Sequence, residues 1–377
     1  MKRILIFIFI IGTANVIKAQ VQNDSLEYRI SSDSLKVGEL YLNINNFNYL
    51  RNYEYFNKIQ DGYTLFGAQL EPQLVYYAHP RLAVIAGVHL RKDFGSPGIY
   101  KTYPLLSIKY QNGSTTLING VLEGNIHHRM IEPLFDFEKK ITEPVEYGTQ
   151  FIVKNKSLFL DAFINWKRMI YKPSPEQEQV LGGLSADIGL INNTNVSVSI
   201  PAQLTVFHQG GQIDVVPQPL QTLVNTALGF KLKFALLGFV NAIRTENYYV
   251  SFNDFSFSPA QAFSKGDGWY LNSAMDTHYG SLSGTYWNGM GYISSNGMPL
   301  YQSVSQQINH MGYTEEHRKL LIIRYSYQMK LIPNLYLDFR FEPLMDLSRP
   351  AGSRKIEFSN SFFLVYRQEF RLLKVKK

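Results

Sequence analysis

Cysteine is absent from the 377-residue chain, and so is any long apolar run beyond the first twenty residues. The lack of cysteine excludes disulfide scaffolds, zinc ribbons, iron–sulfur proteins and cysteine nucleophiles. The longest later apolar runs, Leu82–Val88 and Phe234–Val240, have seven residues each and are too short to span a bilayer as helices. Tyrosine and phenylalanine, with 25 residues each, are too abundant for a disordered chain.

The first residues have the three-part layout of a secretory signal peptide. Met1-Lys2-Arg3 is basic, Ile4–Gly12 is apolar, and the small residue Ala19 precedes a polar stretch. This apolar run is too short for a membrane anchor. We therefore predict a signal peptide at 1–19, a periplasmic N-terminal segment at 20–38 and one domain at 39–377. Part of the net charge of +7 belongs to the signal peptide, so the charge does not indicate nucleic-acid binding.

Beyond the signal peptide, apolar and polar residues alternate with a period of two. In Gly62–Ala78, for example, Phe66, Ala68 and Leu70 alternate with polar residues such as Gln69. Runs of about this length suffice for a tilted strand to cross a bilayer. The same alternation predicts sixteen strands, at 39–48, 62–78, 81–94, 101–111, 115–128, 146–154, 158–168, 179–191, 195–208, 221–234, 237–250, 268–277, 282–293, 318–331, 335–345 and 354–370.

Short and long connections alternate between these strands. Turn residues such as Asn112-Gly113 and Pro333-Asn334 mark the short ones, whereas 129–145 and 294–317 are among the long ones. Bacterial outer-membrane barrels have short periplasmic turns and longer outer loops. We therefore predict an all-β fold, a transmembrane antiparallel up-and-down β-barrel of about 16 strands in the outer membrane, with 14 or 18 strands as alternatives.

Aromatic residues near the predicted strand ends fit this interpretation. Amphipathic rings favour the interface between bilayer and water, although strands are rich in aromatics in any case. The residues expected at the interface are Tyr76, Tyr110, Trp166, Trp287, Tyr366 and Phe370.

The polar positions of the strands predict a lumen of mixed charge. Opposite charges on neighbouring strands form cross-strand pairs, and we expect Arg324, Asp338, Arg340 and Glu357 to form one ladder. Such a lining either selects a neutral or zwitterionic solute or only stabilises the wall. The predicted lumen or channel lining consists of Glu71, His89, Arg91, Lys109, Glu123, Asp161, Lys167, Asp187, Lys231, Lys233, Arg324, Asp338, Arg340, Glu342, Glu357 and Arg367.

The long loops hold further candidates for binding. The loop around 127–146 contains two histidines and several carboxylates, but adjacent histidines on an extended chain point to opposite sides, so we predict no metal site. In the loop 294–317, Ser303, Ser305 and His310 lie close in sequence, without the G-x-S-x-G motif of a hydrolase. The outer-loop binding candidates are His128, Arg129, His208, Gln212, Asp214, Tyr301 and Gln302.

Several stretches resemble exported β-barrel proteins of Bacteroidota. They are Glu54–Asn57, Gly62–Gly67, Leu70-Glu71-Pro72, His128 with Ile131–Glu138, the HQGGQID run at His208–Asp214, and Leu300–Ser305. The resemblance covers most of the mature chain. It implies an outer-membrane barrel and transfers no catalytic residue.

From these observations we expect a porin-like channel for small polar solutes, either sugar-like or zwitterionic. A second hypothesis is a non-conducting barrel that serves as a subunit or docking platform of a cell-surface complex, with a protein partner at the outer loops. A lipid or glycan hydrolase of the outer membrane is the third. The expected partners are outer-membrane lipids and a small solute, without nucleic acid. We expect no enzyme activity, no catalytic residue and no cofactor.

Overall fold

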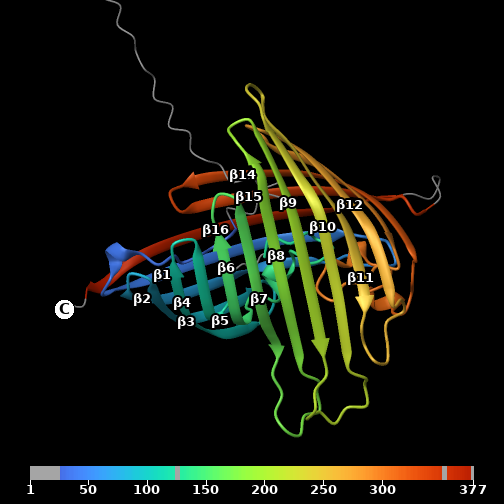
Figure 1. Ribbon diagram of the computed structural model, residues 1–377, viewed down its shortest axis with the longest axis horizontal. Helices are drawn as coiled ribbons and strands as arrows, with labels where there is room; N and C mark the ends of the chain where they lie inside the picture. The colour runs from blue at the N-terminus through green and yellow to red at the C-terminus, as the bar shows by residue number, and fades with distance from the viewer. Residues whose placement is uncertain (1–25, 124–127, 350–354, 375–377) are drawn as a thin grey trace, which may run out of the picture.

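The computed structural model describes residues 26–123, 128–349 and 355–374, and sixteen antiparallel strands dominate these ranges. Each strand pairs with the next, and β1 pairs with β16, so the sheet closes into a barrel (Figure 1). The strands are β1 (Glu39–Glu54), β2 (Thr64–His79), β3 (Leu82–Asp93), β4 (Lys101–Asn112), β5 (Thr115–Val121), β6 (Tyr147–Lys154), β7 (Leu158–Arg168), β8 (Gln179–Asn192), β9 (Val196–Gln209), β10 (Gln221–Ala235), β11 (Val240–Asp254), β12 (Lys265–Thr277), β13 (Gly280–Met290), β14 (His317–Ile332), β15 (Leu335–Asp346) and β16 (Ile356–Lys374).

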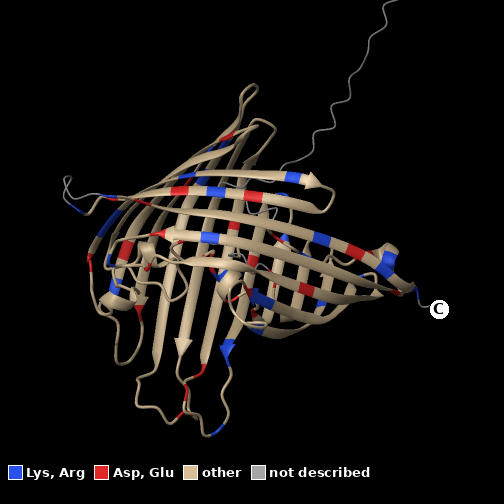
Figure 2. Ribbon diagram, turned by 180° about the vertical axis from the view of Figure 1, so that it is seen from behind, with Lys and Arg blue, Asp and Glu red and all other residues tan. Residues whose placement is uncertain are grey.

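The predicted fold class is confirmed, since the strands close into one antiparallel barrel. The location in the outer membrane fits the side chains, which alternate between a polar lumen face and an apolar lipid face along each strand. Along β9, Ser197, Ser199 and Gln203 are buried, whereas Ile200 on the opposite face is exposed. Lys, Arg, Asp and Glu recur along the strands in Figure 2. Many of these charges, such as Asp161, are buried, because the lumen side of the wall is where they find partners.

Turn chemistry also follows the prediction. Gly113 and Asn334 adopt positive φ angles of 58° and 68° in two of the short turns, a conformation that glycine and asparagine tolerate best. The signal peptide predicted at 1–19 lies outside the described residues. Within the ranges that the structure describes, no helix has the length and apolar character needed to span a bilayer.

Four strand ends lie more than three residues from the predicted ones, and one of them is the end of β11, at Asp254 instead of 250. β1 continues to Glu54 instead of ending at 48, because residues up to Asn52 pair with β2. β16 continues to Lys374, because its last residues pair with the start of β1. β5 ends at Val121 instead of 128, and the chain then turns into the lumen.

Two long connections fill the lumen. We call residues 128–146, which include α1 (Lys139–Thr142), the strap. We call residues 291–316, which include η2 (Pro299–Tyr301) and η3 (Ile308–His310), the inner loop. The strap contacts opposite walls, since Gln69 of β2 donates to the carbonyl of Ile141 (3.1 Å) and Gln203 of β9 accepts from the amide of Ile131 (2.9 Å).

The strap and the inner loop also bond to each other. The amide of Met298 donates to the carbonyl of Glu132 (2.9 Å), and the Tyr292 hydroxyl donates to the carbonyl of Pro133 (3.0 Å). Their apolar side chains form the largest buried cluster, together with wall residues of β1, β7, β8 and β10 to β15. The described lumen is therefore packed across its width.

This packing corrects one aromatic assignment. Trp287 of β13 is fully buried in the lumen cluster, 5.5 Å from the ring of Tyr301, and does not lie at the membrane interface. The inner loop gives this part of the wall an apolar neighbour, so an aromatic residue is accommodated on the lumen side. Tyr76, Tyr110, Trp166 and Phe370 are exposed, and Tyr366 is partly exposed.

Candidate functional site

The wall is incomplete on its long-loop side at β5 and β6. These strands have seven and eight residues, fewer than the about 9–11 that a membrane strand needs. Pairing between β4 and β5 stops at Ser107 and Gly120, so Lys101–Leu106 of β4 has no strand partner there. We call this gap, which lies beyond the end of β5 and the start of β6 on the long-loop side of the barrel, the notch.

Local chemistry is adapted to the notch. Pro104 lies in the part of β4 that pairs with β3 alone, so it has no N–H to leave unsatisfied on the β5 side, and the Tyr147 hydroxyl donates to its carbonyl at 2.9 Å. Gly120 and Gly148 face each other in register at the strand ends. A Cβ on Gly148 would lie 1.8 Å from the carbonyl oxygen of Ile164, so only glycine fits.

The first turn of the strap carries His128 immediately inside the notch. Its Nε2 lies 2.8 Å from Glu146 Oε2, and its Nδ1 lies 3.1 Å from Asp161 Oδ2. The Phe163 ring stacks on the imidazole with centroids 3.7 Å apart. The imidazole is fully buried, and both of its nitrogens face carboxylates.

The backbone at this point is strained. His128 and Arg129 have consecutive positive φ angles of 47° and 58°, which residues other than glycine rarely adopt. The Arg129 carbonyl is held by Gln203 Nε2 at 3.1 Å, and its guanidinium lies 3.9 Å above the Phe159 ring. Strain of this kind persists only where surrounding contacts enforce it, and it is concentrated at functional sites.

Charge at His128 follows from its partners. Burial alone lowers the pKa of an imidazole, but Glu146 and Asp161 outweigh burial and raise the pKa of His128 to about 9. The side chain is therefore an imidazolium at neutral pH. In this arrangement it can donate a proton or stabilise negative charge, and it has no free nitrogen to accept a proton.

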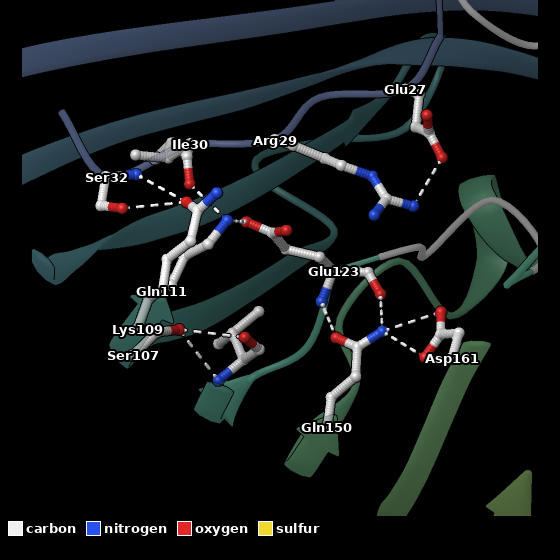
Figure 3. A network of polar contacts seen from close by, with 11 residues as sticks. Glu27, Arg29, Ile30, Ser32, Ser107, Lys109, Gln111, Glu123, Gln150 and Asp161 are labelled. Carbon is white, nitrogen blue, oxygen red and sulfur yellow. Dashed lines mark hydrogen bonds and ion pairs between the residues drawn. The ribbon is translucent and has the colours of Figure 1, made fainter. Parts of the chain in front are cut away.

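Gln150 links this histidine site to a neighbouring cavity. Its Nε2 lies 2.8 Å from Asp161 Oδ1 and 2.6 Å from the carbonyl of Glu123, and its Oε1 accepts from the Glu123 amide (Figure 3). The Glu123 carboxylate accepts from Lys109 Nζ at 2.6 Å. The cavity has a volume of about 70 Å³, and its polar lining consists of Tyr28, Asn45, Glu71, Gln73, Ser107, Lys109, Glu123 and Lys140.

The residues predicted to line the lumen are placed as follows. Glu71, His89, Arg91, Lys109, Asp161, Lys231, Arg324, Asp338, Arg340, Glu342 and Glu357 are buried, and Glu123, Lys167, Asp187, Lys233 and Arg367 are partly exposed. Many are paired within the protein, such as Lys231 with Asp187 and Glu246 (3.0 Å each).

The expected ladder of Arg324, Asp338, Arg340 and Glu357 does not form. Arg324 pairs with Glu342 and with Glu132 of the strap, whereas Arg340 pairs with Asp338 of its own strand at 2.8 Å. Glu357 accepts from Asn57 at 2.6 Å. The strap and the chain after β1 bring in partners that strand order alone does not reveal.

Several outer-loop candidates are interior or face the membrane. Tyr301 and Gln302 are buried, and the Tyr301 hydroxyl donates to Glu132 at 2.6 Å. His208 lies on the lipid-facing side of β9, where its Nδ1 is 3.0 Å from Thr222 Oγ1. Gln212 is exposed and Asp214 partly exposed in the loop after β9.

The hydrolase set considered in the inner loop does not assemble. The Ser303 hydroxyl donates to the carbonyl of Glu316 at 3.1 Å, Ser305 Oγ accepts from the Gln307 amide at 3.0 Å, and His310 bonds to the Gln307 side chain. Sequence reasoning missed Glu146, Gln150 and Phe163, which complete the histidine site. The alternation of polar and apolar residues along the strands shows which of these side chains face the lumen. No local pattern in the sequence shows that they contact His128.

Comparison with solved structures agrees with the fold. Over 89% of this chain, the structure resembles OpdL of Pseudomonas aeruginosa with a TM-score of 0.50, 14% identity and 99% of that chain covered. It resembles the outer membrane protein OprD of the same organism with a TM-score of 0.50, 11% identity and 89% and 95% coverage. At this identity the likeness shows the fold alone. No curated protein matches the chain.

The family comparison corrects the expectation that the chain is not an enzyme. A family model described as lipid A 3'-O-deacylase-type matches residues 31–375, almost the whole barrel. A family named after a deacylase points to an enzyme, and the resemblance to Bacteroidota barrels had carried no such activity. The chain belongs to the lipid A 3'-O-deacylase-type family.

Proposed function

We propose that the protein is an outer-membrane hydrolase that cleaves an acyl ester of a lipid A-type glycolipid at the notch. The observation that carries the proposal is His128, a buried and backbone-strained imidazolium between Glu146 and Asp161, placed inside a gap in the wall. The deacylase-type family supports an ester substrate. The barrel fold supports a substrate that resides in the membrane.

The notch supplies a physical reason for a lipid substrate. The acyl esters of a membrane glycolipid lie at the level where hydrocarbon meets headgroups, and a complete strand wall would separate them from the lumen. At β5 and β6 the strands end early, so the strap forms the boundary at that level. Exposed apolar residues of the adjoining strands, including Leu106 and Phe151, provide a surface for acyl chains.

Hydrolysis of an acyl ester requires two proton transfers. Water adds to the ester carbonyl and loses a proton, and the sugar oxygen leaves as an alkoxide that must gain one, giving a fatty acid and a free hydroxyl. We assign the imidazolium of His128, whose raised pKa keeps it charged, as proton donor to the leaving oxygen. For this step the Nε2–H exchanges its bond to Glu146 for one to the leaving oxygen, while Asp161 keeps the Nδ1–H. Glu123, which lines the adjoining cavity, is the candidate base for the water.

Gln150, Glu146 and Asp161 act through these two groups. Glu146 and Asp161 hold the imidazole in one orientation, and the Phe163 ring covers one of its faces. Gln150 bonds both Asp161 and the Glu123 backbone, so it fixes donor and base relative to each other. They are positioning residues in this proposal.

Fatty-acid release from purified lipid A by the folded barrel in detergent micelles tests the proposal, with mass spectrometry as the readout. We expect His128→Gln and Glu123→Gln each to lower the rate about 10²–10⁴-fold, the range of general acid–base catalysis. The matched control is His79→Gln, an exposed histidine at the end of β2. No release by the wild-type protein, or equal rates in all variants, would refute it.

A second candidate is the channel for small sugar-like or zwitterionic solutes. The charge-paired lumen favours it, since polar walls of balanced charge suit such solutes. Conduction would require the strap and inner loop to move, because both cross the lumen. Wild-type protein in planar bilayers should then show conductance steps, and their absence over a wide voltage range would exclude the channel.

A further inference from the structure

A second and larger cavity lies at the short-turn end of the barrel, away from His128. It has a volume of about 290 Å³, and the N-terminal segment forms one side of it. β1, β2, β16 and the turn between β14 and β15 form the rest. Its lining consists of Tyr28, Arg29, Ile30, Ser31, Asp33, Lys36, Asn43, Tyr77, Asn334, Arg367, Gln368 and Glu369.

The N-terminal segment is fastened to the wall, so the cavity has a fixed shape. Lys109 Nζ donates to the carbonyl of Ile30 at 2.5 Å, and Ser32 Oγ donates to Gln111 Oε1 at 2.9 Å (Figure 3). The Ile30 side chain is buried against Tyr77, and the amide of Gly38 donates to the carbonyl of Tyr77 at 2.9 Å. A ligand would therefore find a preformed site.

The charges that line the cavity largely balance. Lys36 pairs with Glu369. Arg367 lies 5.5 Å above the Tyr28 ring, which also borders the cavity. Since the positive and negative groups satisfy each other, the lining gives little preference to a ligand with net charge.

One polar atom of the lining is shielded from solvent and has no hydrogen-bond partner among the described residues. It is Asn43 Oδ1, an acceptor on a residue that is only 3% exposed. Buried polar groups almost always have partners, because an unpaired one costs free energy. A carboxylate ligand would place only further acceptors against Asn43 Oδ1, whereas a hydroxyl group can donate to it.

We propose that this cavity binds a neutral, polyhydroxylated ligand of about one sugar ring, entering from the periplasmic side. The cavity volume corresponds to roughly ten waters at about 30 Å³ each, enough for a monosaccharide. A hydroxyl group of the ligand donates to Asn43 Oδ1. The surrounding amides of Asn334 and Gln368 offer further partners. The proposal does not depend on the hydrolase function.

The test uses the full barrel in detergent micelles and saturation-transfer NMR with glucose, with maltose and glutamate as competitors. We expect glucose signals that glutamate does not displace, and at least a tenfold loss of affinity in Asn43→Leu. Asn46→Leu is the matched control, since Asn46 lies on the same strand but faces the membrane. Maltose should compete only if the site takes the end of a longer glycan and not a free sugar.

Three outcomes would overturn the proposal: no glucose signal from the wild-type protein, displacement by glutamate, or an Asn43→Leu variant that binds as well as Asn46→Leu. Loss of folding is monitored separately by the heat-dependent gel mobility of the barrel. If Asn43→Leu fails to fold, Asn43→Ala replaces it. That variant also removes the Oδ1 acceptor, and unchanged binding there refutes the site equally.

Discussion

Replacing His128 by Gln should remove a pH dependence of stability that the strap imposes. The pKa of His128 rises from its ordinary value of 6.5 to about 9, because Glu146 and Asp161 outweigh burial. A rise of this size corresponds to about 3 kcal/mol of stabilisation of the folded state. Since the folded pKa is the higher one, this stabilisation is complete below about pH 6.5 and is lost between about pH 6.5 and 9.

Urea unfolding of the barrel in detergent micelles, followed by tryptophan fluorescence, measures this loss. Between pH 6 and pH 9.5 the free energy of unfolding of the wild-type protein should fall by about 3 kcal/mol more than that of His128→Gln. The His79→Gln variant should behave like the wild type, because His79 is exposed at the end of β2. Parallel pH profiles for wild type and His128→Gln would refute the charged, doubly bonded imidazolium.

Three further results are expected. Arg324→Met removes the nearest cationic partner of the buried carboxylate of Glu342, so the free energy of unfolding in urea should fall by roughly 3–5 kcal/mol, and no change would contradict the ion pair. Burial and then the charge of Glu138 raise the pKa of Asp136 to about 7. As the pH rises from about 4 to about 7, the free energy of unfolding in urea should therefore fall less for Asp136→Asn than for the wild type. A protease site inserted after Met311, which is 75% exposed, should be cut on intact cells, and one in the short turn at 156 should not; equal protection would reject the orientation.

The barrel could be predicted because its pattern is local. Alternation along a strand such as Asn195–His208 reflects the two faces of one wall, and Gly113 and Asn334 mark turns by their own conformations. Strand β5 was predicted to reach 128 because Leu122 and Glu123 continue the alternation. The pattern carries no information on whether such residues stay in the wall or turn inward.

The histidine site could not be predicted for a different reason. His128 was identified, but as a residue of an outer loop, because its partners come from β7 and from the end of the strap. Whether Asp161 faces His128 depends on strand register and on the path of the loop through the lumen. Trp287 shows the same limit, since its burial depends on Tyr301 of a loop that is distant in sequence.

The path of the strap also has a consequence for how the barrel is made. Phe137 and Ile141 pack against Phe47 of β1 and Phe363 of β16, the first and last strands, on both sides of the seam where the sheet closes. Closing this seam joins residues more than 300 positions apart, an entropic cost that hydrogen bonds alone must otherwise offset. An apolar segment already inside the open sheet gives both edges a common surface on which to meet. The strap that forms the candidate site would then also serve as a template for assembly, so sequence changes that alter its chemistry are constrained by the need to close the barrel.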